Sequence, residues 1–277
     1  FFEFKNNQKA LLCLPLSFIA GKMMVVRALF SRLNLICVEP GLNPLSSIPP
    51  DICIDFAALT PMQFKDTTHT GRVRKILLGG GPISPEMEQQ YQSLPAEIYH
   101  GFGMTETLSH VAIRRINGVN ASPWFQALPG IHFNTDSRGC LIIDAPFLDV
   151  PVITNDIVDV VNNQSFQWKG RLDNVINSGG IKLFPEEIEK KLYPLIPERF
   201  FVTGLPDDTY GEKVCLIIEG EPYSPGKLSL LQSSLPRYLS KYEKPRAVYF
   251  LNKLQITESG KIQRKENTKM VIQGSTY

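Results

Sequence analysis

The chain has 277 residues, of which 43% are hydrophobic and 20% are charged, and its formal net charge is +2. This composition excludes a disordered chain, and the length suits about two globular domains. No run of roughly 18 apolar residues occurs, so we expect no membrane span, and a net charge near zero gives no reason to expect a nucleic-acid partner.

The first half of the chain predicts alternating strands and helices. Apolar runs at residues 10–16, 34–38, 75–78 and 97–99 indicate strands, and residues 53–59 and 61–65 indicate a strand or a helix start. Helical spacing occurs over residues 22–31 and 84–94, and Ser84 before Pro85 is typical of an N-cap and a first helical residue. This alternation favours a mostly parallel α/β sheet.

The pattern changes after about residue 114. Short apolar runs predict strands at residues 140–144, 150–154, 201–204, 214–219 and 247–251. Helices are predicted from Pro185, where Glu186 and Glu187 favour the helix dipole, and over residues 228–239. We therefore expect a second, smaller α+β unit that begins in the polar turn at residues 170–174.

The cysteines and histidines indicate no metal site. Cys13, Cys37, Cys140 and Cys215 each lie beside Leu or Ile and are expected to be small buried hydrophobic residues. No CxxC pair is present, which favours a reducing, cytoplasmic setting. The four histidines form no i, i+4 pair, so we expect no zinc site.

Two glycine-rich segments follow predicted strands. Gly79, Gly80 and Gly81 come after residues 75–78, at the carboxyl edge where open α/β sheets bind ligands. The segment GFGMTET, residues 101–107, is expected to be a turn in which the backbone approaches a ligand closely. There Thr105 offers a hydroxyl and Glu106 a carboxylate for a cation. The alternative for each segment is a purely structural role, as a tight turn or a turn with a helix cap.

Charged residues and glycines recur in the second half. Asp156 lies between apolar residues beyond a predicted strand, where a carboxylate can accept hydrogen bonds from a ribose diol. Arg171 and Asp173 are opposite charges in the boundary turn, and Gly179 and Gly180 would leave an unobstructed backbone edge. Ordinary turn residues are the alternative interpretation.

The end of the chain is basic. From Arg237 onward there are nine basic and three acidic residues. Within this stretch, Lys261 follows a flexible Ser259–Gly260 turn and could bring a point charge to a phosphoryl or carboxylate oxygen. A solvated face is the alternative, since basic residues are common near a C-terminus.

Taken in order, these segments resemble one family. GGG, GFGMTET, TNDIVD, GRLDNVINSGGIKLFPEEIE and ESGKIQRKE resemble the motifs of the adenylate-forming superfamily, which includes acyl- and aryl-CoA synthetases, luciferases and peptide-synthetase adenylation domains. The resemblance covers essentially the whole chain. Residues 15–30, PLSFIAGKMMVVRALF, look like the acyl-site segment, and GFGMTETLSH and NVINSGGIKLFPEEIE look most like the o-succinylbenzoate–CoA ligases of menaquinone synthesis.

The resemblance implies a fold and an activity. The fold would be a large N-terminal α/β domain, incomplete here and covering residues 1–172, with a small mobile α+β domain over residues 173–277. The activity would be that of an AMP-forming acid–thiol ligase, whose partners are a carboxylic acid, ATP with Mg²⁺, and CoA as co-substrate. The acid first joins ATP, giving an acyl adenylate and pyrophosphate, and the CoA thiol then attacks the adenylate.

The resemblance also implies roles for individual residues. Thr105 would contact the α-phosphate, Glu106 would help to hold Mg²⁺, and Lys261 would bridge carboxylate and phosphate oxygens during adenylation. Asp173 would be the hinge about which the small domain turns. The implied nucleotide and CoA contacts are Gly79, Gly80 and Gly81 at the adenine, Phe102 and Gly103 beside the base, Asp156 and Arg171 at the ribose, and Gly179 and Gly180 at the CoA tunnel.

The acyl pocket is the variable part of such enzymes. Its candidates are Ser17, Phe18, Gly21, Lys22, Thr107, Ser109 and His110. Because o-succinylbenzoate has a second carboxylate, a polar or basic partner is expected, and His110, Lys22 and Arg27 are the candidates. Core packing or surface exposure is the alternative for each.

One family feature has no match. The Ser/Thr/Gly-rich phosphate loop that ends in Pro-Lys is not found in residues 1–16, and we expect it to precede this chain. Three functions stay open: an o-succinylbenzoate–CoA ligase, another acyl-, aryl- or amino-acid-activating enzyme, and a non-catalytic nucleotide-binding module. The oligomeric state, monomer or homo-oligomer, is also open.

Overall fold

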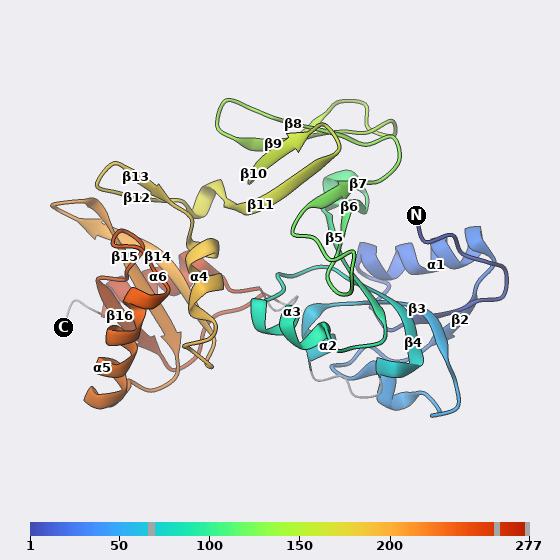
Figure 1. The fold of residues 1–277 in the computed structure, drawn as a ribbon, viewed down its shortest axis with the longest axis horizontal. Helices are drawn as coiled ribbons and strands as arrows, with labels where there is room; N and C mark the ends of the chain where they lie inside the picture. The colour runs from blue at the N-terminus through green and yellow to red at the C-terminus, as the bar shows by residue number, and fades with distance from the viewer. Residues whose placement is uncertain (66–69, 258–260, 275–277) are drawn as a thin grey trace. The chain divides into compact units, whose positions relative to one another are not determined.

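The structure is a computed structural model that describes residues 1–65, 70–257 and 261–274 (Figure 1). The chain divides into two compact units. Unit 1 comprises Phe1–Ser137, Leu141–Thr154 and Asp159–Gln167, and unit 2 comprises Arg138–Cys140, Asn155–Val158 and Trp168–Tyr277. The expected turn at Ser259–Gly260 lies outside the described residues.

Unit 1 begins with a parallel sheet, as the alternating pattern predicts. Neighbouring strands run in the order β2-β1-β3-β4-β5, and each pair is parallel. The strands are β1 (Lys9–Leu12), β2 (Asn34–Cys37), β3 (Ile54–Leu59), β4 (Val73–Leu78) and β5 (Glu97–Gly103). The helices are α1 (Ile19–Ser31), α2 (Pro61–Lys65) and α3 (Pro85–Tyr91). The α/β fold class is therefore confirmed.

Helices cover both faces of this parallel sheet. Alternate strand residues point to opposite faces. One face packs Leu11, Ile76 and Leu78 with Phe64 of α2 and Tyr91 of α3. The other face packs Ala10, Leu12, Phe56 and Leu77 with Met24 of α1. Ser84 caps α3 as expected, because its hydroxyl accepts a hydrogen bond from the Met87 backbone amide.

The sheet continues with antiparallel strands. From β5 the order is β6-β7-β11-β10-β9-β8, and β5 pairs with β6 in the antiparallel sense. These strands are β6 (His110–Arg115), β7 (Phe125–Ala127), β8 (His132–Thr135), β9 (Cys140–Asp144), β10 (Val152–Asn162) and β11 (Ser165–Arg171). The expectation of a mostly parallel sheet therefore holds only for β1 to β5. Short hairpin connections explain the change, since they can join only antiparallel neighbours.

Unit 2 contains a smaller sheet with helices on both faces. Its strands follow the order β13-β12-β15-β14, and β16 pairs with β15. They are β12 (Ile176–Ser178), β13 (Ile181–Leu183), β14 (Phe200–Asp207), β15 (Gly211–Glu219) and β16 (Ala247–Leu251). Residues of α4 (Pro185–Leu192) and α5 (Pro225–Ser234) pack on one face, and Val271 of α6 (Arg264–Gly274) packs on the other. The sequence analysis did not predict α6.

Short 3-10 helices join several of these elements: η1 (Pro44–Ser47), η2 (Thr70–Arg72), η3 (Thr105–Thr107), η4 (Leu172–Asn174) and η5 (Leu235–Arg237). The helix predicted over residues 228–239 ends earlier, at Ser234, because Pro236 has no backbone N–H to donate an α-helical hydrogen bond. The chain continues as the 3-10 helix η5. None of the helices in the described ranges is both long and apolar enough to cross a membrane.

Three local predictions are wrong. Gly101–Gly103 is not a turn, because β5 continues through Gly103 and pairs with β6. Asp156 does not follow a strand but lies inside β10, which runs from Val152 to Asn162. Cys37 is exposed rather than buried, since β2 is an edge strand of its sheet.

Gly21 provides a test of the packing of α1. A Cβ at this position would lie 2.3 Å from the Pro15 carbonyl oxygen and 2.8 Å from that of Leu14. Alanine is a better helix former than glycine by about 1 kcal/mol, but overpacking against backbone typically costs about 1–3 kcal/mol. We expect Gly21→Ala to lower the free energy of unfolding in urea. The control is Gly41→Ala, where a Cβ meets nothing within 4 Å; equal stability of the two variants would contradict the packing argument.

Candidate functional site

Two predicted segments meet at one edge of the parallel sheet. Leu78 of β4 lies opposite His100 of β5, so the segments that follow both strands leave from the same carboxyl edge. After β4 come Gly79, Gly80 and Gly81; Gly80 has φ +79°, and a Cβ on Gly79 would have open space around it. After β5, Thr105 and Glu106 are exposed in η3. An exposed backbone, a hydroxyl and a carboxylate therefore share this edge.

Thr107 holds the turn that presents Thr105 and Glu106. Its side chain is 1% exposed. Its hydroxyl oxygen accepts a hydrogen bond from the Met104 amide at 3.1 Å and lies 2.8 Å from the Ser109 carbonyl oxygen. The sequence analysis placed Thr107 in the acyl pocket, but its polar atoms are used within the turn. Leu108, with φ +61°, completes this tight path into β6.

Gly103 allows β6 to approach β5 closely. A Cβ at Gly103 would lie 2.3 Å from the His110 Cα, so no other residue fits there without movement of the backbone. The register of the two strands shifts between Phe102 and Gly103. Phe102 packs edge-on against Phe166, with ring centroids 5.0 Å apart. The glycine thus serves the β5–β6 contact, a role that the sequence pattern did not reveal.

Arg27 of α1 and His110 of β6 are both half-buried, and His110 lies opposite Gly103 of β5. Burial and, to a smaller extent, the positive charge of Arg27 together lower the pKa of the His110 imidazole to about 4. Burial also lowers the pKa of the Arg27 guanidinium, which lies 5.3 Å from the Phe56 ring centroid and 3.0 Å from the Met24 sulfur. Within the described ranges, Arg27 forms no salt bridge. A half-buried guanidinium without a carboxylate partner among the described residues can pair with an anion.

The other acyl-pocket candidates are spread out. Ser17 and Lys22 are exposed, and Phe18 is 49% exposed. The Ser109 hydroxyl lies 3.2 Å from His110 Nδ1. Gly21 is buried, and an added Cβ would meet the backbone of Pro15.

Asp156, Arg171 and Asp173 meet within unit 2. Asp156 is 6% exposed and accepts a hydrogen bond from Trp168 Nε1 at 2.9 Å. Arg171 spans both acids, with its Nη1 3.2 Å from Asp156 Oδ2 and its Nη2 3.3 Å from Asp173 Oδ2. The Asn155 amide lies 3.4 Å from Asp173 Oδ2. The predicted ribose pair is thus connected to the predicted hinge through one guanidinium.

Trp168 and Asn155 were not found from the sequence. Trp168 lies on β11 and Asn155 on β10, neighbouring strands, and neither belongs to a recognisable motif. In the sequence, Trp168 stands out only as an aromatic residue two positions before Gly170. An aromatic residue there does not by itself indicate that its indole bonds to Asp156.

The remaining candidates of unit 2 are exposed loop residues. Gly179 and Gly180 form the turn between β12 and β13, with φ +58° and +81°, conformations that favour glycine. The Gly179 amide donates to the Tyr210 carbonyl oxygen at 2.8 Å. Lys261 is exposed, beside a short antiparallel bridge between Ile256 and Ile262. The predicted residues therefore fall in both units, with Thr105 and Glu106 in unit 1 and Lys261 in unit 2.

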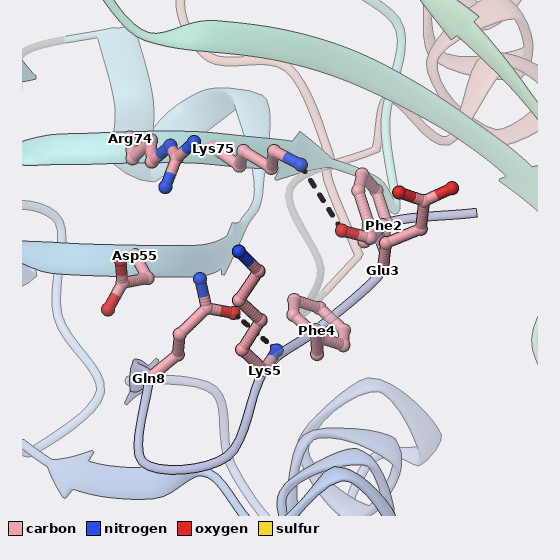
Figure 2. Close-up of a pocket in the computed structure, with 8 residues that line it drawn as sticks. All are labelled: Phe2, Glu3, Phe4, Lys5, Gln8, Asp55, Arg74 and Lys75. Carbon is pink, nitrogen blue, oxygen red and sulfur yellow. Dashed lines mark hydrogen bonds between the residues drawn. The ribbon is translucent and has the colours of Figure 1, made fainter.

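A separate cavity of about 230 Å³ in unit 1 is not part of this site (Figure 2). Asp55 and Lys75, which line it, lie near the amino ends of β3 and β4, whereas the candidate residues follow the carboxyl ends. Lys75 Nζ donates to the Phe2 carbonyl oxygen at 3.2 Å, and the Lys5 amide donates to Gln8 Oε1 at 2.9 Å. These bonds hold the segment before β1 over the sheet.

Comparisons with known proteins identify the family of the chain. The family model described as AMP-binding enzyme matches residues 1–129. The chain is 27% identical to the 2-succinylbenzoate--CoA ligase of Lactococcus lactis, over 94% of this chain and 62% of that protein. It thus spans about three fifths of the length of the curated relatives it matches.

Two solved structures extend the comparison. The o-succinylbenzoate CoA synthetase of Bacillus subtilis, in complex with an acyl-adenylate intermediate, shares the fold with a TM-score of 0.80 and 18% identity, over 96% of this chain and 62% of that one. The acyl-CoA synthetase (AMP-forming)/AMP-acid ligase II-like protein of Dyadobacter fermentans is 34% identical, with a TM-score of 0.60, over 97% of this chain and 79% of that one. The chain therefore belongs to the AMP-binding, adenylate-forming enzymes.

Proposed function

We propose that the protein carrying this chain is an ATP-dependent acid–CoA ligase whose substrate is an aryl acid with a second carboxylate, such as o-succinylbenzoate. The observation that carries the proposal is the half-buried Arg27 guanidinium beside His110, without a salt-bridge partner in the part of the chain that the structure describes. A substrate carboxylate would satisfy this charge. The similarity to 2-succinylbenzoate--CoA ligases supports the same substrate class.

In the first half-reaction, a carboxylate oxygen of the acid attacks the α-phosphorus of ATP, and the bond to the bridging oxygen of pyrophosphate breaks. Two anions approach each other in this step, so cationic groups are needed to offset their repulsion. Lys261 would supply one charge, and the Thr105 hydroxyl would donate to an α-phosphate oxygen. The backbone of Gly79, Gly80 and Gly81, of which Gly80 is exposed, would accommodate adenine, and Asp156 with Arg171 would hold the ribose.

The donor set at η3 suits a magnesium ion. Mg²⁺ binds through one or two carboxylates together with substrate phosphates and waters, and the exposed carboxylate of Glu106 provides one such ligand. The described residues contain no cluster of three metal-ligating side chains, so no all-protein cage is expected. When bound, the ion would neutralise charge on the phosphates.

In the second half-reaction, the thiolate of CoA attacks the acyl carbon and AMP leaves with the bonding electrons. Lys261 is no longer needed at the phosphate, and a face with unobstructed backbone is needed for the pantetheine arm. Gly179 and Gly180 would provide that face. Asp173 would be the hinge between the two arrangements, and the Arg171 bridge to Asp156 and Asp173 links the hinge with the ribose residues.

Lys261→Ala tests the adenylation step. Removing a charge that stabilises the transition state typically lowers the rate roughly 10²- to 10³-fold, and we expect a loss of that size. The measurement is acid- and CoA-dependent release of AMP by the protein carrying this chain, over a panel of acids. Lys265→Ala is the control, because it removes an equally exposed charge four residues away. Undiminished AMP release by Lys261→Ala would contradict the mechanism.

Arg27→Gln tests the substrate class. A hydrogen bond to a charged group contributes about 1.5–3 kcal/mol, which corresponds to a rise in KM of roughly 10- to 150-fold for a dicarboxylic acid. The control is an analogue that lacks the second carboxylate, whose KM should not change with this substitution. If the KM of both acids rises equally, Arg27 supports the fold and does not bind the second carboxylate.

His110 predicts a pH dependence of stability. In the folded protein its pKa is about 4, and the usual value is 6.5. Between these two values the unfolded chain binds a proton that the folded chain does not, so stability falls as pH drops through this range. We expect the melting temperature of His110→Gln to fall less than that of the wild type from pH 7 toward 4.5. His132→Gln, which removes an exposed histidine, should follow the wild type.

A further inference from the structure

Two short segments, residues 255–257 and 261–263, are the arms on either side of the residues that the structure leaves out, and they are hydrogen-bonded to each other. The Thr257 amide donates to the Lys261 carbonyl oxygen at 2.8 Å, and the Lys261 amide donates to Thr257 Oγ1 at 3.1 Å. Closer to the base of the loop, the Gln263 amide donates to the Gln255 carbonyl oxygen at 2.9 Å. The position of Lys261 therefore depends on where residues 255 and 263 are fixed.

Asn267 connects both arms at that base. It lies in the first half of α6, and its side chain is 0% exposed. Its Nδ2 donates to the Gln255 carbonyl oxygen at 2.9 Å and to the Gln263 carbonyl oxygen at 2.8 Å. Its Oδ1 accepts from the Gln255 amide at 2.8 Å. Both donors of the amide are thus used, one on each arm.

Burying the polar side chain of Asn267 at this position costs free energy of desolvation. Asparagine is a poor helix former, and packing alone would be served better by an apolar residue. All three side-chain hydrogen bonds go to residues 255 and 263, and the Asn267 backbone amide also donates to the Gln263 carbonyl oxygen at 3.1 Å. The buried Asn117 of unit 1 is bonded in the same way. Its side-chain Oδ1 accepts from the Ile98 backbone amide at 3.0 Å, and its Nδ2 donates to the Ala96 carbonyl oxygen at 2.8 Å.

The helix that bears Asn267 is itself fixed to unit 2. Arg264, the first residue of α6, makes a bidentate ion pair with Glu189 of α4, at 2.6 and 2.7 Å. Its Nη1 also donates to the Val202 carbonyl oxygen at 2.9 Å, and the Val202 amide donates to Glu189 Oε1 at 2.7 Å. Bidentate pairs with additional hydrogen bonds fix geometry strongly. The start of α6, which follows Lys261 in the chain, is therefore fixed to α4 and β14.

We propose that Asn267 is a positioning residue for Lys261: its side-chain amide joins residues 255–257 to residues 261–263 and so sets where the lysine ammonium lies during adenylation. The inference rests on the proposed function for the role of Lys261. Because Lys261 acts only when the acyl adenylate forms, loss of the anchor should slow that half-reaction and spare the attack by CoA.

The test compares the two half-reactions in Asn267→Ala and Asn267→Asp, the second of which keeps the shape but places an oxygen against two carbonyl groups. A misplacement of about 1 Å can reduce a rate 10²-fold, so we expect the adenylation kcat, followed by acid-dependent exchange of pyrophosphate with ATP, to fall roughly 10- to 100-fold. The KM values for ATP and acid should change little. Thioester formation from a synthetic acyl adenylate and CoA should keep its wild-type rate.

The matched control is Asn117→Ala, which also removes a buried amide but in unit 1. It reports the general effect of lost stability, and we expect it to leave the ratio of the two half-reaction rates unchanged. If both half-reactions fall equally in the Asn267 variants, as for a destabilised protein, the positioning role is overturned. It is also overturned if adenylation by Asn267→Ala equals that of the wild type.

A second measurement separates this inference from the proposed function. Amide hydrogen exchange followed by mass spectrometry should show faster exchange at Gln255 and Gln263 in Asn267→Ala, with β14 and β15 protected as in the wild type. A wild-type protein that exchanges no pyrophosphate with any acid would refute the proposed function, and the exchange result would still decide the anchor. Unchanged exchange at both glutamines would overturn it.

Discussion

The parallel pairing of β4 with β5 is the constraint on which the candidate site depends. In a parallel pair both strands end at the same edge, so the register that places Leu78 opposite His100 also brings Gly80 beside the segment that carries Thr105 and Glu106. An antiparallel pairing would send these segments to opposite edges. The sheet then turns antiparallel at β6, and the close approach that this requires is possible only because position 103 is glycine.

The close approach of β6 to β5 also affects the protonation of His110. This residue of β6 lies opposite Gly103 of β5, where burial and the charge of Arg27 keep the imidazole neutral at physiological pH. The guanidinium is left as the cation of a largely apolar region that includes Phe56 and Met24. A charge in such surroundings is stabilised best by an oppositely charged group. The substrate class proposed above rests on this charge, which has no carboxylate partner in the described part of the chain.

Unit 2 uses buried polar groups for a different purpose. Arg171 is shared between Asp156 and Asp173, and Arg264 with Asn267 ties α6 to α4, to β14 and to both arms of the loop that carries Lys261. A fully satisfied polar cluster fixes geometry more narrowly than apolar packing does, because its hydrogen bonds are directional. The exposed groups that would act on substrate lie in the same unit as these fixed polar clusters; they are Lys261, Gly179 and Gly180.

The sequence alone determined the α/β alternation, the Ser84 cap, the order of the motifs and the family, because apolar periodicity and cap residues act over a few neighbouring positions. The site residues remain predictions. The tertiary structure decided what depends on distant partners: that GFG is a strand, that Asp156 meets Trp168 and Arg171, that Cys37 lies at an exposed edge, and that Asn267 reaches Gln255. Register and the partners of buried amides are set by contacts between remote segments, which no local pattern encodes.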